Sequence, residues 1–300
     1  MLRVAYRPEY AHPLPEGHKF PMEKYELLPQ QLLYEGTLRP ENFFVPDALA
    51  TEDILAVHDA EYLRRLRARE LTAREMRKTG FPQSEALIRR EELIMGGTVQ
   101  AALFALEHGC ALNIAGGTHH AFTDRGEGFC LLNDLALAAR YLLRHGQAQR
   151  PLIVDLDVHQ GNGTAQIFRE DSAVFTFSMH CRANYPLHKE VSDLDIELAP
   201  GTADETYLSL LTQALEDIMA RRRPDFILYQ CGVDVLATDK LGHLALTLEG
   251  CKERDRRVLQ LCHQKGLPVV AAMGGGYSPR IADIVEAHAN TFRLAAQLWG

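Results

Sequence analysis

The chain has 300 residues, of which 46% are hydrophobic, and it carries a formal net charge of -8 at pH 7. This apolar content is sufficient for one large α/β core or two small ones. The negative charge argues against a general nucleic-acid-binding protein. No apolar run is long enough to span a membrane. Residues 1–6 lack the apolar run of a signal peptide, and the six cysteines form no CxxC pair. We therefore expect a cytoplasmic protein with free thiols.

Residues 47–92 are predicted to be mainly helical and are rich in charge. Their Arg-Arg-Leu-Arg-Ala-Arg run at 64–69 suggests nucleic-acid binding when it is taken alone. Acidic residues interleave with it, however, and this favours a solvated helix face. These residues are Glu61, Glu70, Glu75 and Glu85.

From about residue 94, apolar strand-like runs alternate with helix-like segments. The strand-like runs lie at 112–115, 152–156, 173–178, 226–231 and 268–273, and the helix-like segments lie near 96–108, 134–145, 205–221 and 249–265. Such alternation is typical of βαβ units, in which helices cover both faces of a parallel sheet. We therefore predict a single open α/β/α domain over residues 1–300, with a mostly parallel central sheet.

The segment 152–163 combines a short apolar run with polar residues at alternate positions, namely Asp155, Asp157 and His159. Alternate side chains of an extended chain share a face, so two carboxylates and an imidazole converge at the end of a strand. A buried site cannot hold this cluster unless something pairs with it. Oxygen and nitrogen ligands without thiolate indicate a catalytic zinc ion or a similar first-row metal.

Three other predicted strands are also followed by glycines and catalytic-type side chains. Gly-Gly-Thr-His-His at 116–120 follows the predicted strand at 112–115. Gly232 and Asp234 follow the strand at 226–231, and Gly-Gly-Gly-Tyr at 274–277 follows the strand at 268–273. Because open parallel sheets bind ligands beyond the carboxyl ends of their strands, the four segments together predict one site. Each segment has an ordinary explanation when taken alone. The histidine pair would be one surface and one core histidine, and the aspartate would be a helix N-cap. The three glycines would be a phosphate-binding turn, although they lack the G-x-G-x-x-G frame of a dinucleotide site.

In this order the motifs resemble those of the zinc-dependent histone deacetylase family, which has the arginase/deacetylase fold. The matching segments are Gly-Gly-Thr-His-His-Ala at 116–121, Gly-Phe-Cys at 128–130, Asp-x-Asp-x-His-x-Gly-x-Gly at 155–163, Gly-Val-Asp with Asp-Lys-Leu-Gly within 232–242, and Gly-Gly-Gly-Tyr at 274–277. A His-Asp-Ala-Glu-Tyr-Leu segment at 58–63 extends the resemblance towards the N-terminus. The Gln160-Gly-Asn-Gly and Asn184-Tyr-Pro segments look most like the class IV branch and its bacterial relatives.

The resemblance implies a zinc-dependent hydrolase that removes acetyl or longer fatty-acyl groups from lysine side chains of proteins or peptides. Asp157, His159 and Asp234 would bind one zinc ion, which polarises the amide carbonyl and activates a water molecule. His120 would be the general base, and Tyr277 would donate its hydroxyl to the oxyanion. The residues implied to bind substrate are Gly128, Phe129, Tyr185, Leu241 and Gly275.

His119 would be the companion histidine, hydrogen-bonded towards Asp155. Asn162 occupies the position at which some relatives have an aspartate partner for the second histidine. An amide cannot stabilise an imidazolium as a carboxylate does, so the division of acid and base duties between the two histidines stays open. The class II and class IV branches also carry Asn there, so we do not expect loss of activity. The resemblance further implies a potassium site formed by Asp155, Asp157, His159, Ser178 and Met179.

Three other functions were weighed against this one. A dinuclear manganese ureohydrolase needs further carboxylates, and Gly161 and Leu236 stand at those positions. An acetylpolyamine amidohydrolase would use the same residues, but the short 181–190 segment favours an open-mouthed protein or peptide deacylase. A non-catalytic acyl-lysine binder would be expected to lack a metal ligand or Tyr277, and all are present.

The length of the acyl group depends on the space near the metal. The class IV resemblance implies a preference for long fatty-acyl groups, which would need an apolar cavity. Small residues near the site either leave room for that chain or only permit close backbone turns. These residues are Gly116, Gly117, Gly128, Gly274 and Gly275.

Overall fold

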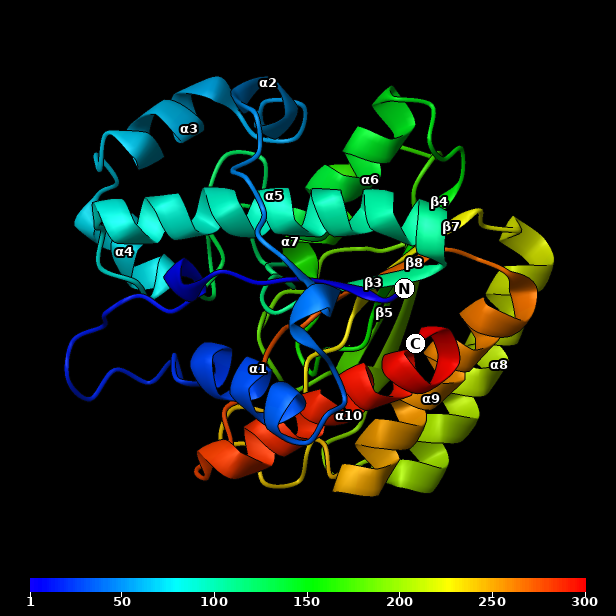
Figure 1. The fold of residues 1–300 in the computed structure, drawn as a ribbon. Helices are drawn as coiled ribbons and strands as arrows, with labels where there is room; N and C mark the ends of the chain where they lie inside the picture. Colours follow the sequence, from blue (N-terminus) through cyan, green and yellow to red (C-terminus); the bar gives the residue numbers. More distant parts are fainter.

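A computed structural model describes residues 1–300 and contains one sheet of eight strands (Figure 1). The strand order is β2-β1-β3-β8-β7-β4-β5-β6, and every neighbouring pair is parallel. The strands are β1 (Arg3–Ala5), β2 (Phe43–Phe44), β3 (Cys110–Asn113), β4 (Pro151–Asp155), β5 (Phe175–Cys181), β6 (Leu194–Leu198), β7 (Phe226–Gln230) and β8 (Val269–Ala272).

Helices cover both faces of the sheet, with α2 to α7 on one side and α1, α8, α9 and α10 on the other (Figure 1). The first group comprises α2 (Thr51–Ile54), α3 (Ala60–Arg67), α4 (Ala73–Thr79), α5 (Glu85–His108), α6 (Asp134–Arg144) and α7 (Asn162–Phe168). The second comprises α1 (Lys24–Tyr34), α8 (Asp204–Arg222), α9 (Leu248–Lys265) and α10 (Ile281–Trp299). Two short 3-10 helices lie at Pro8–Tyr10 and Pro40–Asn42.

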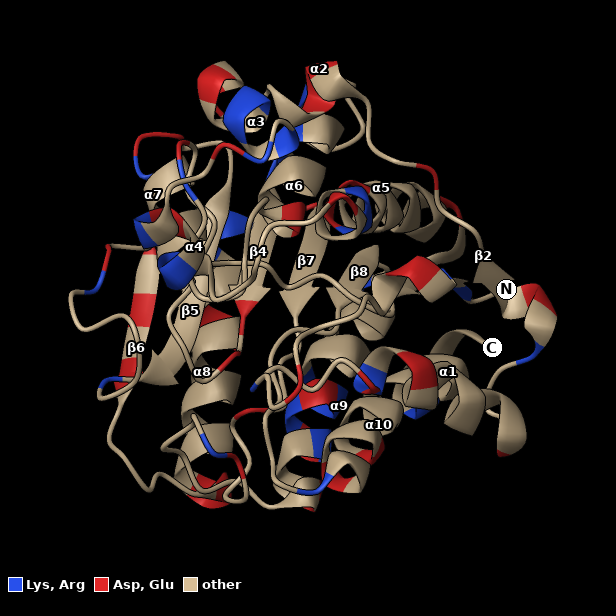
Figure 2. Cartoon of the chain, turned by 90° about the vertical axis from the view of Figure 1, so that its left-hand side faces the viewer, with Lys and Arg blue, Asp and Glu red and all other residues tan.

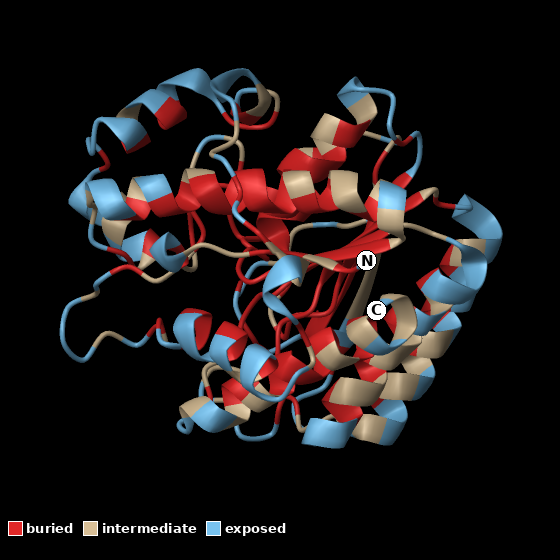
Figure 3. Ribbon diagram, in the orientation of Figure 1, coloured by how far each residue is buried: buried red, intermediate tan, exposed pale blue.

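The core is one continuous cluster of 82 buried apolar residues between the sheet and its two helical layers (Figure 3). The central strands are mainly apolar because both faces are covered, and all five residues of β4 and of β7 are buried, including the polar residues at their carboxyl ends. These strands were the easiest to predict. The predicted α/β/α architecture is confirmed, and the sheet is wholly parallel.

Several elements differ from the sequence-based expectation. Strand β3 begins at Cys110 and not at 112, and β5 runs to Cys181 and not to 178. The analysis did not anticipate β1, β2 and β6, which are very short or lie at the edge of the sheet. It also did not anticipate α1, α7 and α10. A proline within α1, at position 29, weakens the helical signal there.

The basic run at 64–69 lies on α3 and the turn after it, where basic and acidic residues lie close together (Figure 2). Three of its arginines form ion pairs with glutamates, which supports the prediction of a solvated helix face. These pairs are Arg64 with Glu61 and Glu70, Arg65 with Glu75, and Arg67 with Glu92.

All six cysteines are buried free thiols, as predicted. No helix combines the length and the apolar character that crossing a membrane requires.

The register of the central strands aligns their carboxyl ends. Asn113 at the end of β3 pairs with Ala272 of β8, Ala272 with Gln230 of β7, Gln230 with Asp155 of β4, and Asp155 with Ser178 of β5. The loops that follow β3, β8, β7 and β4 therefore leave the sheet at one level and from adjacent positions. This arrangement brings the four sequence motifs together.

Candidate active site and metal centre

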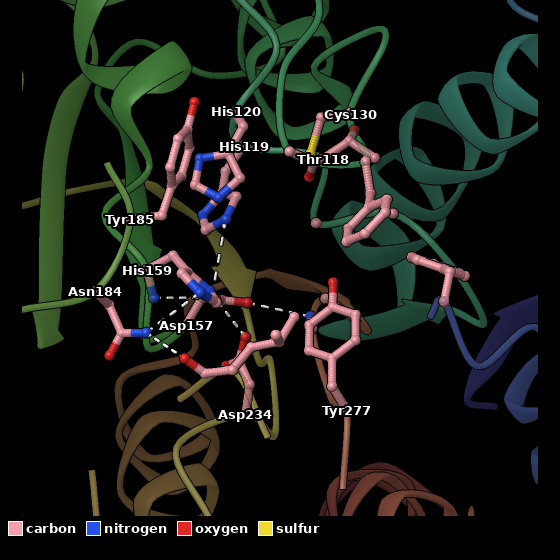
Figure 4. Close-up of a pocket in the computed structure, with 18 of the residues that line it drawn as sticks. Thr118, His119, His120, Cys130, Asp157, His159, Asn184, Tyr185, Asp234 and Tyr277 are labelled. Atoms are coloured by element: carbon pink, nitrogen blue, oxygen red, sulfur yellow. Dashed lines mark hydrogen bonds and ion pairs between the residues drawn. The ribbon is translucent and has the colours of Figure 1, made fainter. Parts of the chain in front are cut away.

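The loops at the carboxyl edge of the sheet enclose a pocket of about 310 Å³ (Figure 4). The residues that were predicted to bind metal or substrate all line it, as do His119, His120 and Tyr277. Of the other predicted site residues, Asp155, Asn162, Ser178 and Met179 lie outside the lining. The pocket is thus assembled from segments that are far apart in the sequence.

Asp157, His159 and Asp234 form a compact group in which one ligand atom of each lies within 4.8 Å of the others. Nδ1 of His159 lies 3.0 Å from Oδ1 of Asp157 and 3.2 Å from Oδ2 of Asp234. Hydrogen bonds to other residues hold both aspartates in place. Oδ2 of Asp157 accepts from Nε2 of Gln230 at 2.9 Å, and Oδ1 of Asp234 accepts from the backbone N–H of Val158 at 3.0 Å.

In the absence of a metal ion, protons balance much of the negative charge of this group. Both aspartates are almost completely buried. Burial and the neighbouring Asp157 carboxylate raise the pKa of Asp234 to about 7. Burial alone would lower the pKa of His159, but its hydrogen bonds to the two carboxylates outweigh burial and raise the pKa to about 10. Two buried carboxylates that share one imidazole form an anionic nitrogen and oxygen donor set, which fits a divalent first-row metal.

His119 and His120 each bind a different partner through Nδ1. Nδ1 of His119 donates to Oδ2 of Asp155 at 2.7 Å, and Nδ1 of His120 donates to Oδ1 of Asn162 at 2.6 Å. Their ring centroids are 4.1 Å apart. Both hydrogen bonds agree with the predicted pairings.

The two partners give the histidines different charges. Burial lowers the pKa of His119, but the carboxylates of Asp155 and Asp157 outweigh burial and raise it to about 9. Burial and the positive charges of His119 and His159 lower the pKa of His120 well below its ordinary value. At neutral pH His119 is therefore an imidazolium, and His120 is neutral with Nε2 free to accept a proton.

Aromatic rings form much of the remaining pocket wall. The Tyr277 ring centroid lies 5.9 Å from that of Phe129, and the edge of the Tyr185 ring meets His120 with centroids 5.0 Å apart. Burial and the nearby Asp234 carboxylate raise the pKa of Tyr277, so its hydroxyl stays protonated and can donate. Its backbone N–H donates to Oδ2 of Asp239 at 2.6 Å. The labelled side chains converge on one cavity (Figure 4).

Residues 18–292 match the model of the histone deacetylase domain family. This chain belongs to the histone deacetylase family. It is 31% identical over 278 residues to histone deacetylase 2 of Arabidopsis thaliana, covering 89% of this chain and 72% of the relative. It is 32% identical over 298 residues to a probable deacetylase of Archaeoglobus fulgidus, and the match covers 92% of this chain and 81% of the relative. An uncharacterized Picosynechococcus protein is 46% identical over 296 residues and 99% of each chain.

Solved structures share the fold. A histone deacetylase homologue complexed with SAHA superposes with a TM-score of 0.85 at 24% identity, covering 99% of this chain and 84% of that one. The HDA15 histone deacetylase domain gives a TM-score of 0.82 at 21% identity, covering 96% and 89%. At these identities the likeness establishes the arginase/deacetylase fold alone.

In this histone deacetylase-family site, five glycines line the pocket, and each also lies close to neighbouring atoms in the direction that a Cβ would take. A Cβ on Gly128 would lie 2.6 Å from Cδ2 of His120, and one on Gly275 would lie 2.2 Å from Oδ2 of Asp234. A Cβ on Gly116, Gly117 or Gly274 would also lie within 2.6 Å of a neighbouring atom. Close backbone approach is therefore a sufficient reason for glycine at these positions.

Two of the five predicted potassium ligands line a much smaller cavity. Asp155 and Ser178 line a cavity of about 10 Å³ beside the sheet, together with Thr164 and Thr176. This volume is close to what one water-sized sphere needs. Met179, Asp157 and His159 are not part of its lining.

The sequence analysis missed a buried lysine beneath the glycine-rich turn. Lys24 of α1 donates from Nζ to the carbonyl oxygen of Gly274 at 3.0 Å, although it is 250 residues away. Burial lowers the pKa of Lys24 to about 8, against the opposing effect of Asp234 and Asp157. Nothing in the local sequence marks this residue, because its partner is set by the packing of α1 near the turn that carries Tyr277.

A buried ion pair of α9 supports the turns that carry the aspartates. Nη1 of Arg254 donates to the carbonyl oxygens of Leu156 at 3.1 Å and Gly232 at 2.5 Å. Its guanidinium pairs with Asp255, and both residues are fully buried. The carbonyl groups belong to the residue before Asp157 and to the residue two before Asp234, so Arg254 joins the two turns. The sequence shows Arg254 only as one of several charges in a helix.

Proposed function

We propose that this member of the histone deacetylase family is a zinc-dependent amidohydrolase that removes acyl groups from lysine side chains of proteins or peptides. The observation that carries the proposal is the convergence of Asp157, His159 and Asp234 with the histidine pair and Tyr277 in one pocket. The family supports an amide hydrolase. We further propose that residues 1–300 form one catalytic domain of the class IV type, and the free thiols support a cytoplasmic location.

The metal ligands would be Asp157, His159 and Asp234. Their donor atoms are close enough together to bind one ion. A divalent ion would replace the proton that His159 holds between the two carboxylates. A zinc ion bound there supplies a Lewis acid for the amide carbonyl and lowers the pKa of a water molecule. The protein contributes the fixed direction of the ligands, through Gln230 and the backbone N–H of Val158.

His120 would take the proton of the attacking water at Nε2, since its Nδ1–H is held by Asn162. Its depressed pKa keeps it neutral and able to accept. His119, held by Asp155 as an imidazolium, would stabilise negative charge that develops beside it. A proton on His120 could then pass to the leaving amine. This division of duties rests on the different partners of the two rings.

Tyr277 would donate its hydroxyl to the carbonyl oxygen as negative charge develops there. Phe129 and Tyr185 would contact the lysine stem, with Leu241 at the rim and Gly128 and Gly275 as close backbone walls. We also propose that the cavity beside Asp155 and Ser178 takes a potassium ion. Unfolding temperatures measured in potassium and sodium chloride at equal ionic strength test this, and equal values would contradict it.

The substrate class is tested with acyl-lysine peptides of increasing chain length. Each methylene that finds an apolar cavity contributes roughly 0.8 kcal/mol, and the glycines near the metal group line the same pocket as the proposed substrate-binding residues. A long chain therefore has to occupy the pocket of about 310 Å³ that the lysine stem also enters. We expect acetyl-lysine to be hydrolysed and kcat/KM to fall from decanoyl- to myristoyl-lysine.

An acetylated polyamine in the same panel tests the alternative substrate. A kcat/KM higher for the polyamine than for every acyl-lysine peptide would replace the proposed substrate class. A steady rise of kcat/KM up to myristoyl would instead show that the pocket opens beyond its present volume.

A further inference from the structure

Glu127 lies at the rim of the pocket and accepts hydrogen bonds from three side chains. Oε2 accepts from the hydroxyl of Tyr185, and Oε1 accepts from Nζ of Lys78 at 2.9 Å and from Nε of Arg125 at 3.0 Å. The Glu127 side chain is only 10% exposed. Burial alone would raise its pKa, but these hydrogen bonds outweigh burial and lower it, so Glu127 is a carboxylate.

Glu127 connects two walls of the pocket that come from distant segments. It directly precedes Gly128 and Phe129, which line the pocket, and its partner Tyr185 follows β5. The backbone N–H groups of Gly128 and Phe129 donate to the carbonyl oxygens of Lys78 and Thr79 on α4, at 2.9 and 2.8 Å. The wall that contains Gly128 and Phe129 is therefore fixed to α4. The Glu127 side chain extends from this wall and holds the opposite wall, which contains Tyr185.

The hydrogen bond also sets the direction of the Tyr185 ring. Tyr185 is 40% exposed and its ring meets the His120 ring edge-on, with an interplanar angle of 87°. Without a partner for its hydroxyl, a side chain this exposed would adopt other rotamers. Both carboxylate oxygens of Glu127 are occupied, so they are not free to bind substrate or to transfer a proton.

We propose that Glu127 is a positioning residue which, through the Tyr185 hydroxyl, fixes the width of the pocket mouth and so determines its affinity for the lysine stem. The proposal rests on the function proposed above. A fixed mouth lowers the ordering cost of binding the flexible acyl-lysine stem, because the wall does not have to be immobilised when substrate enters. Neither Glu127 nor Tyr185 belongs to the metal group, so we expect the contact to act mainly on KM.

Three variants test the pair in the full chain loaded with zinc, with kcat and KM measured on acyl-lysine peptides. Tyr185→Phe removes one oxygen atom, Glu127→Ala removes the acceptor, and Glu127→Gln retains an acceptor without the charge. We expect the first two to raise KM by up to about tenfold, the cost of ordering one mobile side chain when substrate binds, with kcat within about twofold. Glu127→Gln should recover part of the loss. Tyr34→Phe and Glu216→Gln, at exposed positions, are the matched controls.

The double variant Glu127→Ala/Tyr185→Phe distinguishes a shared contact from two separate ones. Because both single changes remove the same hydrogen bond, the double variant should raise KM no more than either alone. Additive effects, an unchanged KM in Tyr185→Phe, or a fall confined to kcat would overturn the proposal and leave the hydrolase assignment standing. If Glu127→Ala does not fold, the KM values of Tyr185→Phe and Glu127→Gln are compared with that of the unmodified protein, and an unchanged KM in Tyr185→Phe overturns the proposal. Absence of acyl-lysine hydrolysis by the unmodified protein would overturn the proposed function, and this proposal with it.

Discussion

Asp234→Ala is expected to abolish most of the hydrolytic activity by removing one of three metal ligands. Loss of a residue that only supports a ligand typically reduces metal affinity or activity 10–100-fold, so loss of a ligand itself should exceed about 100-fold. The fold should survive, because burial and Asp157 already make the Asp234 carboxylate unfavourable without a cation. Asp234→Asn, which can still accept from the N–H of Val158, should behave in the same way.

Metal binding gives a readout that does not depend on turnover. If zinc binds this proposed ligand set, which is assembled only in the folded state, it should raise the unfolding temperature of the unmodified protein. That rise should be lost in Asp234→Ala and retained in Asp217→Ala, an exposed aspartate on α8. Full activity of Asp234→Ala, or two zinc ions per chain by elemental analysis, would contradict the assignment.

His120→Ala is expected to lower kcat by about 10²–10⁴-fold, the usual contribution of a general base. His119→Ala should have a smaller effect, because His119 is held as an imidazolium and contributes by its charge. The difference has two causes. The Asp155 carboxylate favours the protonated form of His119, whereas burial and the neighbouring positive charges keep His120 neutral because the Asn162 amide carries no charge to oppose them.

Asn162→Asp tests the cause of this division. A carboxylate at position 162 should raise the pKa of His120 and make the two histidines more alike, which would shift the acid limb of the kcat profile to higher pH. Metal content should be unchanged in all three variants, as His119, His120 and Asn162 are not in the metal group. A larger loss in His119→Ala than in His120→Ala would reverse the assigned roles.

The sequence predicted the parts of the site whose signal is local. Asp155, Asp157 and His159 follow a buried strand at alternate positions, so their convergence follows from strand geometry. The resemblance then supplied pairings that the structure shows, such as His119 with Asp155. The central strands were predictable for a similar reason, because each is a short apolar run between turn residues.

The missed residues have partners that no local pattern reveals. Lys24 meets a carbonyl group 250 residues away, and Glu127 meets Tyr185 at a separation of 58 residues. Arg254 resembles its charged neighbours on α9 until packing buries it. The glycines near the site differ from these residues, because their positions were predictable from the sequence. The space around each glycine, however, depends on atoms from other segments.

Hydrolysis of acetyl-lysine peptide by the full chain before chelation, after chelation and after stepwise return of zinc tests the central claim most directly. The three ligands predict loss of activity on chelation and recovery that saturates at one zinc per chain. Activity that chelation leaves unchanged, or zinc-loaded protein that hydrolyses no acyl-lysine peptide, would contradict the account.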